Sequence, residues 1–251
     1  MGTYLGHNSR VYGLEYANTD LIISGANDGH INSWIISTRK TLKYINSNNT
    51  VRCLQILWPN NIVASGHADG SIKMWNYLDG SFLKSLEGHS AIVYDFVLIS
   101  FDLLASSSGD KSIILWNLTT SLIKNKLTGH QDSVNGLKFI SPNFLVSGST
   151  DFSVKVWDLQ KGKLLNSLNY HTNTVYWSID LFSSDIIICG SFDSRITFWE
   201  ISTGFKLVDT INTSLEIRSL VTVNELNCKL FKKTTYFYRV KNTSFIICIE
   251  I

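Results

Sequence analysis

Residues 129–158 read GHQDSVNGLKFISPNFLVSGSTDFSVKVWD, and the pattern of this stretch returns along the chain with a nearly fixed period. Its tryptophan belongs to a series spaced 41, 41, 41 and 42 residues apart: Trp34, Trp75, Trp116, Trp157 and Trp199. An aspartate stands six residues before each of them. One supersecondary unit is therefore repeated, and a period of about forty with Gly-His early and tryptophan late is typical of a four-stranded propeller blade.

Turn signals separate short apolar runs within each unit, which is the pattern of a four-stranded sheet. Pro59 and Pro142, the only two prolines, fall between such runs, where proline presets the backbone of a turn. A glycine follows three of the tryptophans by five residues, and we expect positive φ at Gly80, Gly162 and Gly204. In the quoted repeat the expected strands are Val134–Ile140, Phe144–Ser147, Val154–Trp157 and Leu164–Leu168.

The length of the chain sets the number of units. At about 41 residues per unit, 251 residues hold about six, of which five are clear. Helical periodicity is absent, so we predict an all-β fold: a β-propeller of four-stranded blades, about six, with one degenerate C-terminal blade. We expect a single domain over residues 1–251. The expected repeats are 6–46, 47–87, 88–128, 129–169, 170–212 and the degenerate 213–251.

Recurring dipeptides mark the same points of several units. They are Gly6-His7, Gly88-His89 and Gly129-His130 at the front, Ser24-Gly25, Ser65-Gly66 and Ser147-Gly148 in the second strand, and Trp157-Asp158 at the end. By these motifs, residues 5 to about 212 resemble the WD-repeat family of β-propellers. The resemblance implies blades around a central channel. It places the loop before each first strand and the loop between the second and third strands on one face, called the top.

Three units carry a full set of histidine, serine, aspartate and tryptophan. The sets are His7, Ser24, Asp28 and Trp34; His89, Ser106, Asp110 and Trp116; and His130, Ser147, Asp151 and Trp157. A hydrolytic triad uses three of these residue types, but three equivalent copies and the absence of a Gly-x-Ser-x-Gly elbow argue against a nucleophile. The resemblance implies a buried hydrogen-bond network instead, and we predict no catalytic residue.

Two of the clear units depart from this set. The second unit has Asn48 and Asn49 in place of Gly-His, and the fifth has Cys189 in place of the second-strand serine. His30 and His67 lie outside the three sets, and we expect both in exposed loops.

The C-terminal part loses the pattern after Val223. We interpret it as a degenerate sixth blade, with a misassigned or truncated terminus as the alternative. Members of the family usually close the ring by pairing an N-terminal strand with the last blade, and residues 3–5 are the segment that remains for this pairing.

Composition and spacing argue against several classes of function. A net charge of +2 from 22 basic and 20 acidic residues gives no broad field for a phosphate backbone, so no nucleic acid is expected. The chain has no His-x-x-His, Cys-x-x-Cys or phosphate-loop spacing, so we expect neither a metal nor a cofactor. Two of the four cysteines lie inside hydrophobic runs, which predicts reduced, inert thiols. No apolar run reaches the length of a membrane span and no targeting segment is recognisable, so we expect no membrane association and a cytoplasmic location, with a nuclear one as the alternative.

In the family that the chain resembles, partners contact top-face residues beside the first-strand valine and before the turn aspartate. The equivalent positions here give the predicted contact residues Arg10, Tyr12, Arg52, Tyr94, Asn135, Tyr176, Phe192 and Arg218. Tyrosine and arginine are enriched at binding hot spots. We expect the arginines to attract an acidic or phosphorylated segment while the rings pack its apolar side chains. The alternative is that these side chains only line and solvate the channel entrance.

The predicted function is a non-catalytic protein–protein interaction scaffold that binds a partner protein or peptide on the top face. The alternative is a substrate-recognition subunit of a ubiquitin ligase. Against that alternative, the chain has no Trp-Asp-x-Arg motif, since Trp157-Asp158 continues with Leu159-Gln160. The sequence names neither the partner nor the oligomeric state.

Overall fold

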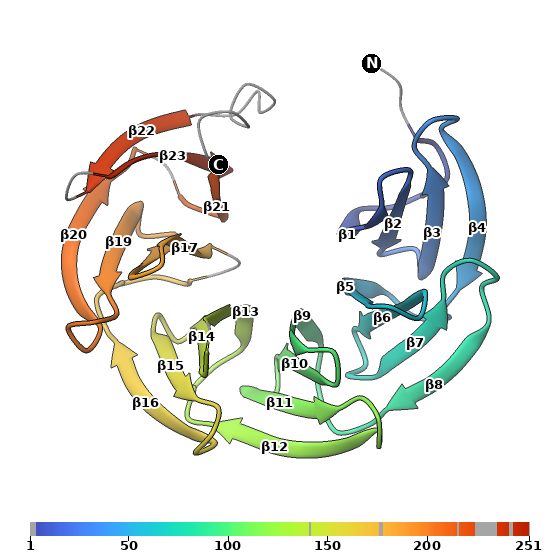
Figure 1. Ribbon diagram of the computed structural model, residues 1–251, viewed down its shortest axis with the longest axis horizontal. Coiled ribbons are helices and arrows are strands. Elements are labelled where there is room, and N and C mark those ends of the chain that lie inside the picture. Colours follow the sequence, from blue (N-terminus) through green and yellow to red (C-terminus); the bar gives the residue numbers. More distant parts are fainter. Residues whose placement is uncertain are drawn as a thin grey trace. The chain divides into compact units, whose positions relative to one another are not determined.

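The structure is a computed structural model, and it describes residues 4–140, 142–175, 178–214, 216–223, 235–240 and 243–250. Within these ranges every regular element is a β-strand. None of the described residues forms a helix with the length and hydrophobicity that crossing a membrane requires. The chain divides into two compact units, Met1–Thr128 and Gly129–Ile251, which we describe in turn (Figure 1). The single domain over residues 1–251 stays a prediction.

Unit 1 contains three four-stranded antiparallel sheets, in each of which neighbouring strands are consecutive in sequence. They are β1 (Val11–Asn18), β2 (Leu21–Ala26), β3 (His30–Ile35) and β4 (Lys40–Asn46); β5 (Val51–Leu57), β6 (Ile62–His67), β7 (Ile72–Asn76) and β8 (Phe82–Leu86); and β9 (Val93–Ser100), β10 (Leu103–Ser108), β11 (Ser112–Asn117) and β12 (Leu122–Thr128). The first strands are neighbours, β1 of β5 and β5 of β9, and the fourth strands lie at the outside of the unit (Figure 1).

Unit 2 contains two further sheets of the same kind. They are β13 (Val134–Ile140), β14 (Phe144–Ser149), β15 (Val154–Asp158) and β16 (Lys163–Leu168); and β17 (Ile179–Ser183), β18 (Ile186–Gly190), β19 (Arg195–Glu200) and β20 (Lys206–Asn212). All four strands expected in the quoted repeat are present: the first has the expected bounds, and each of the other three differs by one or two residues at one end. The five four-stranded sheets confirm the predicted all-β class and blade type.

The last described sheet of unit 2 differs from the others. It contains β21 (Ser219–Val223), β22 (Thr235–Val240) and β23 (Thr243–Glu250), in the spatial order β21-β23-β22. Its central strand is therefore the last in sequence, whereas a regular blade keeps sequence order. At the other terminus, Tyr4 and Leu5 are not in a strand, and Thr3 lies outside the described residues.

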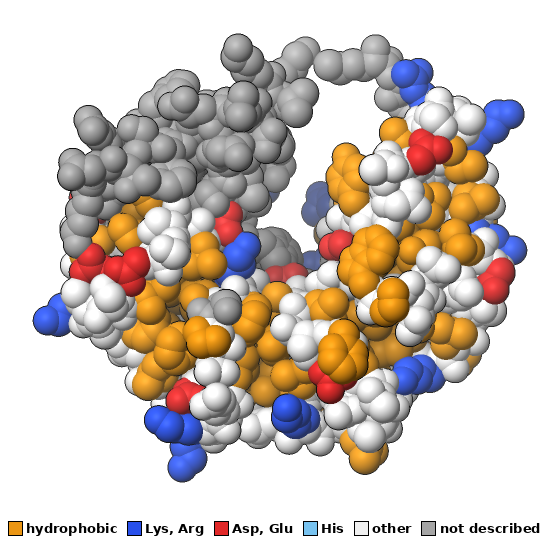
Figure 2. Space-filling view, in the orientation of Figure 1, with side chains coloured by type: hydrophobic (Ala, Val, Ile, Leu, Met, Phe, Trp, Pro, Cys, Tyr) orange, Lys and Arg blue, Asp and Glu red, His pale blue; other side chains and the backbone are white. Residues whose placement is uncertain are grey.

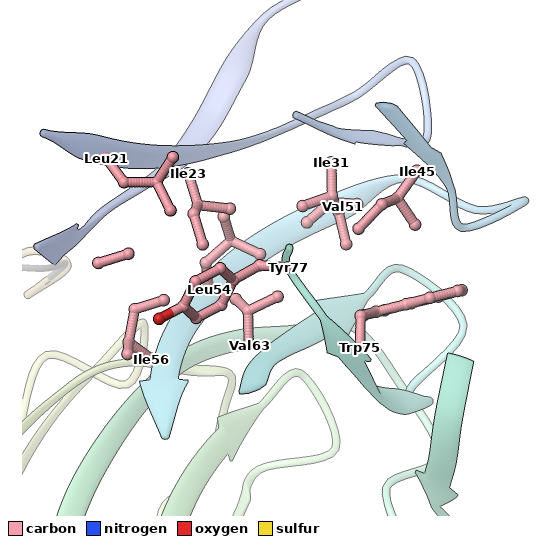
Figure 3. Close-up of a cluster of buried hydrophobic side chains, with 11 residues drawn as sticks. Leu21, Ile23, Ile31, Ile45, Val51, Leu54, Ile56, Val63, Trp75 and Tyr77 are labelled. Atoms are coloured by element: carbon pink, nitrogen blue, oxygen red, sulfur yellow. The ribbon is translucent and has the colours of Figure 1, made fainter. Parts of the chain in front are cut away.

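Consecutive sheets of unit 1 pack face to face through aliphatic side chains. Ile23 and Ile31 of the first sheet belong to the same buried cluster as Val51, Leu54 and Ile56 of the second (Figure 3). Gly66 of the Ser-Gly motif makes the next contact possible, because a Cβ at this position would lie 2.8 Å from Val93 Cγ1. The glycine therefore lets the first strand of one sheet approach the second strand of the preceding sheet.

Each tryptophan lies opposite an irregularity in the fourth strand of its sheet. The register shifts between the residue before the tryptophan and the tryptophan itself in all five four-stranded sheets. The fourth strand supplies the extra residue, as Leu42 does opposite Trp34, so the bulge belongs to that strand. The turns that follow the tryptophans contain the expected glycines, which have φ of 79° at Gly80, 62° at Gly162 and 81° at Gly204.

Candidate functional site

Two loops meet on one side of every clear sheet, and we call this side the loop face. One loop precedes the first strand and the other joins the second strand to the third. In the first sheet they are tied together by His7 and Asp28, whose Nδ1 and Oδ2 atoms are 3.2 Å apart, and by the Asn8 backbone N–H, which donates to Asp28 at 2.8 Å. The loop face is thus held by side chains that the repeat itself supplies.

All three full sets form continuous networks. His7 Nε2 lies 2.8 Å from Ser24 Oγ, and Trp34 Nε1 donates to the same oxygen at 2.7 Å. The corresponding distances are 2.7 and 2.7 Å around Ser106, and 2.7 and 2.8 Å around Ser147. The carboxylate lies 2.9 Å from His89 Nδ1 in one set and 2.8 Å from His130 Nδ1 in the other. Because an ionised carboxylate only accepts, Nδ1 carries the proton and Nε2 accepts from serine.

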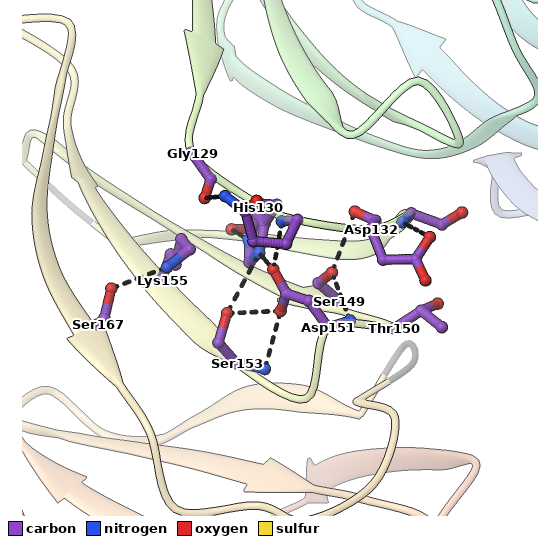
Figure 4. A network of polar contacts seen from close by, with 12 residues as sticks. Gly129, His130, Asp132, Ser149, Thr150, Asp151, Ser153, Lys155 and Ser167 are labelled. Carbon is purple, nitrogen blue, oxygen red and sulfur yellow. Dashed lines mark hydrogen bonds and ion pairs between the residues drawn. The ribbon is translucent and has the colours of Figure 1, made fainter.

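Electrostatics keep the network of the fourth sheet in one ionisation state. Burial by itself raises the pKa of the Asp151 carboxyl, but hydrogen bonds from His130 and Ser153 outweigh burial and hold this pKa well below its ordinary value. Burial lowers the pKa of His130 despite the neighbouring carboxylate. Figure 4 shows His130 and Ser153 both directed at Asp151. An ionised aspartate beside a neutral imidazole is therefore the stable pair.

The second sheet completes its network with a residue that we expected elsewhere. His67, predicted to lie in an exposed loop, is fully buried at the end of β6, so that prediction is wrong. Its Nε2 atom is 2.8 Å from Ser65 Oγ, to which Trp75 Nε1 donates at 2.9 Å. Its Nδ1 atom faces the Asn49 carbonyl at 3.4 Å, where the full sets have a carboxylate. The spacing was the available signal, because residues two apart on a strand share a face.

The fifth sheet replaces its hydroxyl in a similar way. Trp199 Nε1 donates to Thr197 Oγ1 at 2.9 Å, and His171 Nε2 lies 3.1 Å from the same atom. His171 Nδ1 is 3.0 Å from Asp193 Oδ2. Thr197 on β19 thus takes the place of the serine that Cys189 displaced, and sequence reasoning missed it. Threonine and tryptophan are again two residues apart on one strand, so their side chains share a face.

His30 also differs from the prediction of an exposed loop. It begins β3 and is half-buried, with its ring 4.4 Å from the ring of Tyr44 between centroids. Its Nδ1 atom is 3.5 Å from Asp28 Oδ1, outside good hydrogen-bond geometry for this pair. Strand position and ring packing account for its burial.

Three of the four predicted contact residues of unit 1, all but Arg10, are the extra residues of β-bulges. In β1 the pairing passes from Val11 to Gly13, and in β5 from Val51 to Cys53, so Tyr12 and Arg52 each have no partner in the ladder. The same shift in β9 leaves out Tyr94. A bulge turns its extra side chain out of the alternation of the strand. The three side chains therefore reach one another across neighbouring first strands.

Arg52 is the centre of this group. Its guanidinium carbon lies 4.0 Å from the centroid of the Tyr12 ring and 5.6 Å from that of Tyr94, while the Arg10 guanidinium is 6.0 Å from Tyr12. We call these four residues the arginine–tyrosine stack. Arg10 is exposed and the other three are half-buried. Such cation–π contacts hold a guanidinium with its planar faces against the rings.

The predicted contact residues of unit 2 divide into three cases. Arg218 is exposed, with its guanidinium carbon 5.7 Å from the Phe192 ring centroid. Asn135 is also a bulge residue, but it is buried and donates to Thr150 Oγ1 at 2.9 Å, and its contact with a partner stays a prediction. Tyr176 lies outside the described residues.

Comparison with known proteins agrees with this geometry. The family model "WD domain, G-beta repeat" matches residues 1–34, 39–76, 80–117 and 121–158, which together are more than half of the chain. The chain belongs to the WD-repeat family. A solved structure, the crystal structure of the computationally designed Ika8 protein, is similar with a TM-score of 0.76 and 30% identity, over 98% of this chain and 72% of that chain. No curated protein matches. The WD-repeat match ends before the fifth repeat, whose network nevertheless forms through Thr197.

The serines of this WD-repeat protein are poorly placed for chemistry. Ser24, Ser106 and Ser147 are buried, and each oxygen already accepts from a tryptophan. A nucleophilic serine must be reachable by its substrate and lie beside an oxyanion hole. Among the residues that the structure describes, no three of His, Cys, Asp and Glu are grouped as metal ligands would be. The WD-repeat networks are therefore suited to holding loops in place.

Proposed function

We propose that the protein is a non-catalytic interaction scaffold and that the loop face of unit 1 binds an acidic or phosphorylated segment of a partner protein. The observation that carries this proposal is Arg52 between Tyr12 and Tyr94. Tyrosine and arginine provide large contact area with directed polar groups, which is why both are enriched at binding hot spots. Three bulges bring them together on a face whose loops are fixed by the networks.

The chemistry of Arg52 supports an anionic ligand. Its guanidinium carbon has aromatic rings nearby, at 4.0 Å from the centroid of Tyr12 and 5.6 Å from that of Tyr94. Arg52 Nε is buried and has no hydrogen-bond partner among the described residues. A buried donor without a partner is costly. A carboxylate or phosphate would supply the acceptors, since guanidinium binds either one through two parallel hydrogen bonds. Arg10, whose guanidinium carbon is 6.0 Å from the Tyr12 ring centroid, adds a second cation.

Unit 2 offers a separate, smaller contact. Arg218 above Phe192 repeats the pairing of a cation with an aromatic ring on the loop face of that unit. We include both residues and Tyr176 in the proposed contact set, and we leave out Asn135 because it is buried. The alternative of a ubiquitin-ligase substrate receptor stays a prediction.

A peptide library in matched versions tests the proposal. Each peptide is made with serine, phosphoserine, aspartate or lysine at one central position, and its Kd is measured by fluorescence polarisation. We expect phosphoserine and aspartate versions to bind best. Arg52→Ala and Tyr94→Ala should weaken their binding about tenfold or more.

Two further variants sharpen the test. Arg52→Lys keeps the charge but loses the planar, two-point donor, so it should recover only part of the affinity. Lys124→Ala removes an exposed cation from the outer strand β12 and serves as the matched control. Identical binding profiles for wild type, Arg52→Ala and Tyr94→Ala would end the proposal.

A further inference from the structure

An aspartate stands in the turn before the third strand of each clear sheet, and of these five residues only Asp69, in the second sheet, is exposed. Asp28 and Asp110, in the sheets on either side, have side-chain exposures of 10% and 5%. Both neighbours of the second sheet belong to unit 1, because β5 lies between β1 and β9. The environment of Asp69 is therefore set within this unit.

The histidine that changed position explains the exposure. In the third sheet a loop histidine lies 2.9 Å from Asp110 Oδ2. In the second sheet the loop has Asn49 instead, and His67 directs its Nδ1 atom at the Asn49 carbonyl. Asp69 Oδ1 accepts from the backbone N–H and the hydroxyl of Ser71 at 2.9 and 2.7 Å. The network of this sheet is thus completed without the carboxylate, which stays at the surface.

Asp69 carries a negative charge that no cation of the described residues neutralises. Burial by itself raises its pKa, but hydrogen bonds from Ser71 and Asn49 outweigh burial and hold this pKa below its ordinary value. Among the residues that the structure describes, no Lys or Arg nitrogen lies within ion-pair distance of the carboxylate. The hydrogen bonds also fix its orientation, which lowers the entropy that a ligand would lose on binding to it.

Asp69 and Arg52 lie at the same end of one hairpin, on the loop face. The Ala68 backbone N–H donates to the Thr50 carbonyl at 3.2 Å, and Arg52 and Asp69 are each within two residues of this bond. Arg52 Nε is buried and has no acceptor among the described residues. This end of the hairpin therefore presents a guanidinium that needs an acceptor beside a carboxylate that needs a cation.

The distribution of charge makes such single groups decisive. Acidic and basic side chains are interspersed on the face of unit 1 that Figure 2 shows, and the whole chain has a net charge of only +2. A broad field of one sign is not available to select a partner. Selection must come from charges that are matched one to one, which also excludes partners that place like charges together.

We propose that Asp69 binds a lysine or arginine that flanks the acidic or phosphorylated residue of the partner segment. This inference rests on the proposed function and adds a requirement to it, since the segment must carry both signs of charge. Its anion meets Arg52 and its cation meets Asp69. A segment whose flanking residues are all acidic is repelled by Asp69, so acidity alone does not define the partner.

Phosphoserine peptides with a scanned lysine test the inference. The parent peptide has phosphoserine at the centre and alanine at every flanking position, and each derivative replaces one flanking alanine by lysine. Kd is measured by fluorescence polarisation. We expect lysine at one position, or at two neighbouring ones, to tighten binding to wild type about two- to fivefold. Asp69→Asn keeps an acceptor for Ser71 but removes the charge, so it should lose this gain and bind the parent peptide nearly as wild type does.

Asp79 provides the matched control, because it occupies the same kind of turn at the other end of β7. Its Oδ1 atom accepts from the Ser81 backbone N–H at 2.8 Å and from the Ser81 hydroxyl at 2.6 Å. Asp79→Asn should therefore retain the full gain from lysine. A charge exchange adds a readout that a merely structural role would not move: Asp69→Lys should prefer glutamate where wild type prefers lysine. Circular dichroism and thermal unfolding verify that the variants are folded.

Failure of this inference is distinguishable from failure of the proposed function. A gain from lysine that Asp69→Asn retains would overturn the role of Asp69. So would a scan in which no position favours lysine although Arg52→Ala still weakens binding of the parent peptide, and the proposed function would stand in both cases. A parent peptide that binds wild type and Arg52→Ala equally would overturn the proposed function, and this inference with it.

Discussion

His67 Nε2 lies 2.8 Å from Ser65 Oγ, two residues earlier on the same strand. In the full sets the histidine comes from the loop before the first strand. His130, for example, contacts Ser147, which is the equivalent of Ser65 in its own sheet. In the fifth sheet it is the hydroxyl that comes from a different strand, through Thr197. The chain therefore keeps the network of indole, hydroxyl and imidazole while its members change position in the sequence.

Thr197→Val should lower the free energy of unfolding by about 1–3 kcal/mol, because it leaves Trp199 Nε1 and His171 Nε2 buried without their common partner. Chemical denaturation followed by tryptophan fluorescence measures the change. Thr41→Val, at an exposed position of β4, is the control. Adding Cys189→Ser to Thr197→Val restores a hydroxyl at the usual position and should recover stability. Equal losses for both threonine variants would contradict a role for the hydroxyl.

His67 should make the protein less stable as pH falls from about 6.5 to about 4. Burial, followed by the nearby Lys73, lowers the pKa of His67 from 6.5 to about 4 in the folded protein. Between these values the unfolded chain binds more protons than the folded one, so stability rises with pH in this window. The contribution is about 1–3 kcal/mol. Denaturation at a series of pH values should show a shallower slope for His67→Gln than for wild type, and equal slopes would contradict the assignment.

Glu15 should make stability depend on pH in the opposite direction from His67. Burial raises its pKa from 4.5 to about 7, against a smaller effect of a hydrogen bond from the Ile56 backbone. The folded state then holds the proton that the unfolded state has lost, so stability falls as pH rises from 4.5 to about 7. Glu15→Gln should raise the free energy of unfolding at pH 8 by about 1–2 kcal/mol and leave it nearly unchanged at pH 5. Glu216→Gln, at an exposed glutamate, should show no such difference.

Phe152→Gly should stabilise the protein by about 0.5–1 kcal/mol. Phe152 has φ of 70° in the turn after Asp151, whereas Gly29 and Gly70 occupy the equivalent turns with φ of 79° and 92°. A left-handed backbone is costly for a bulky residue and free for glycine. Gly70→Ala is the reverse change and should destabilise, since its Cβ would lie 2.6 Å from the His89 carbonyl oxygen. Thermal unfolding decides both, and a lower Tm for Phe152→Gly would contradict the strain.

Cys53 and Cys189 should not react with iodoacetamide in the folded protein. Both are free and buried, and burial raises the pKa of each thiol well above its ordinary value. The thiolate is the reactive form, so a buried thiol of raised pKa is inert. Mass spectrometry of labelled peptides, before and after unfolding in urea, should show both residues modified only after unfolding.

Much of the fold could be predicted because the same residue types recur at the same position in each repeat. The tryptophan spacing locates each third strand, and Gly80 and Gly204 locate the following turns. The position of His67 is a weaker signal, since this histidine lies off the period of the others. Its place two residues after Ser65 on one strand is the sign that the two side chains share a face.

The sequence predicted which residues lie at the candidate site, but it did not predict how deeply each of them is buried. Tyr12, Arg52 and Tyr94 were named from their place beside a valine, and the structure brings them together at bulges. Asn135 occupies the same place but is buried, because Thr150 and the Val175 carbonyl accept from its amide. Burial depends on neighbours from other strands, which spacing along one chain does not specify.

The bulges of the first strands have a consequence for how the face can change. Tyr12, Arg52 and Tyr94 stand outside the backbone ladder, so neither the pairing of the strand nor the alternation of its buried side chains depends on their identity. The proposed contact residues can therefore change without altering the pairing of the strands. Under the proposed function, substitutions at these three positions would change which partner the face binds, while the surrounding sheet stays the same.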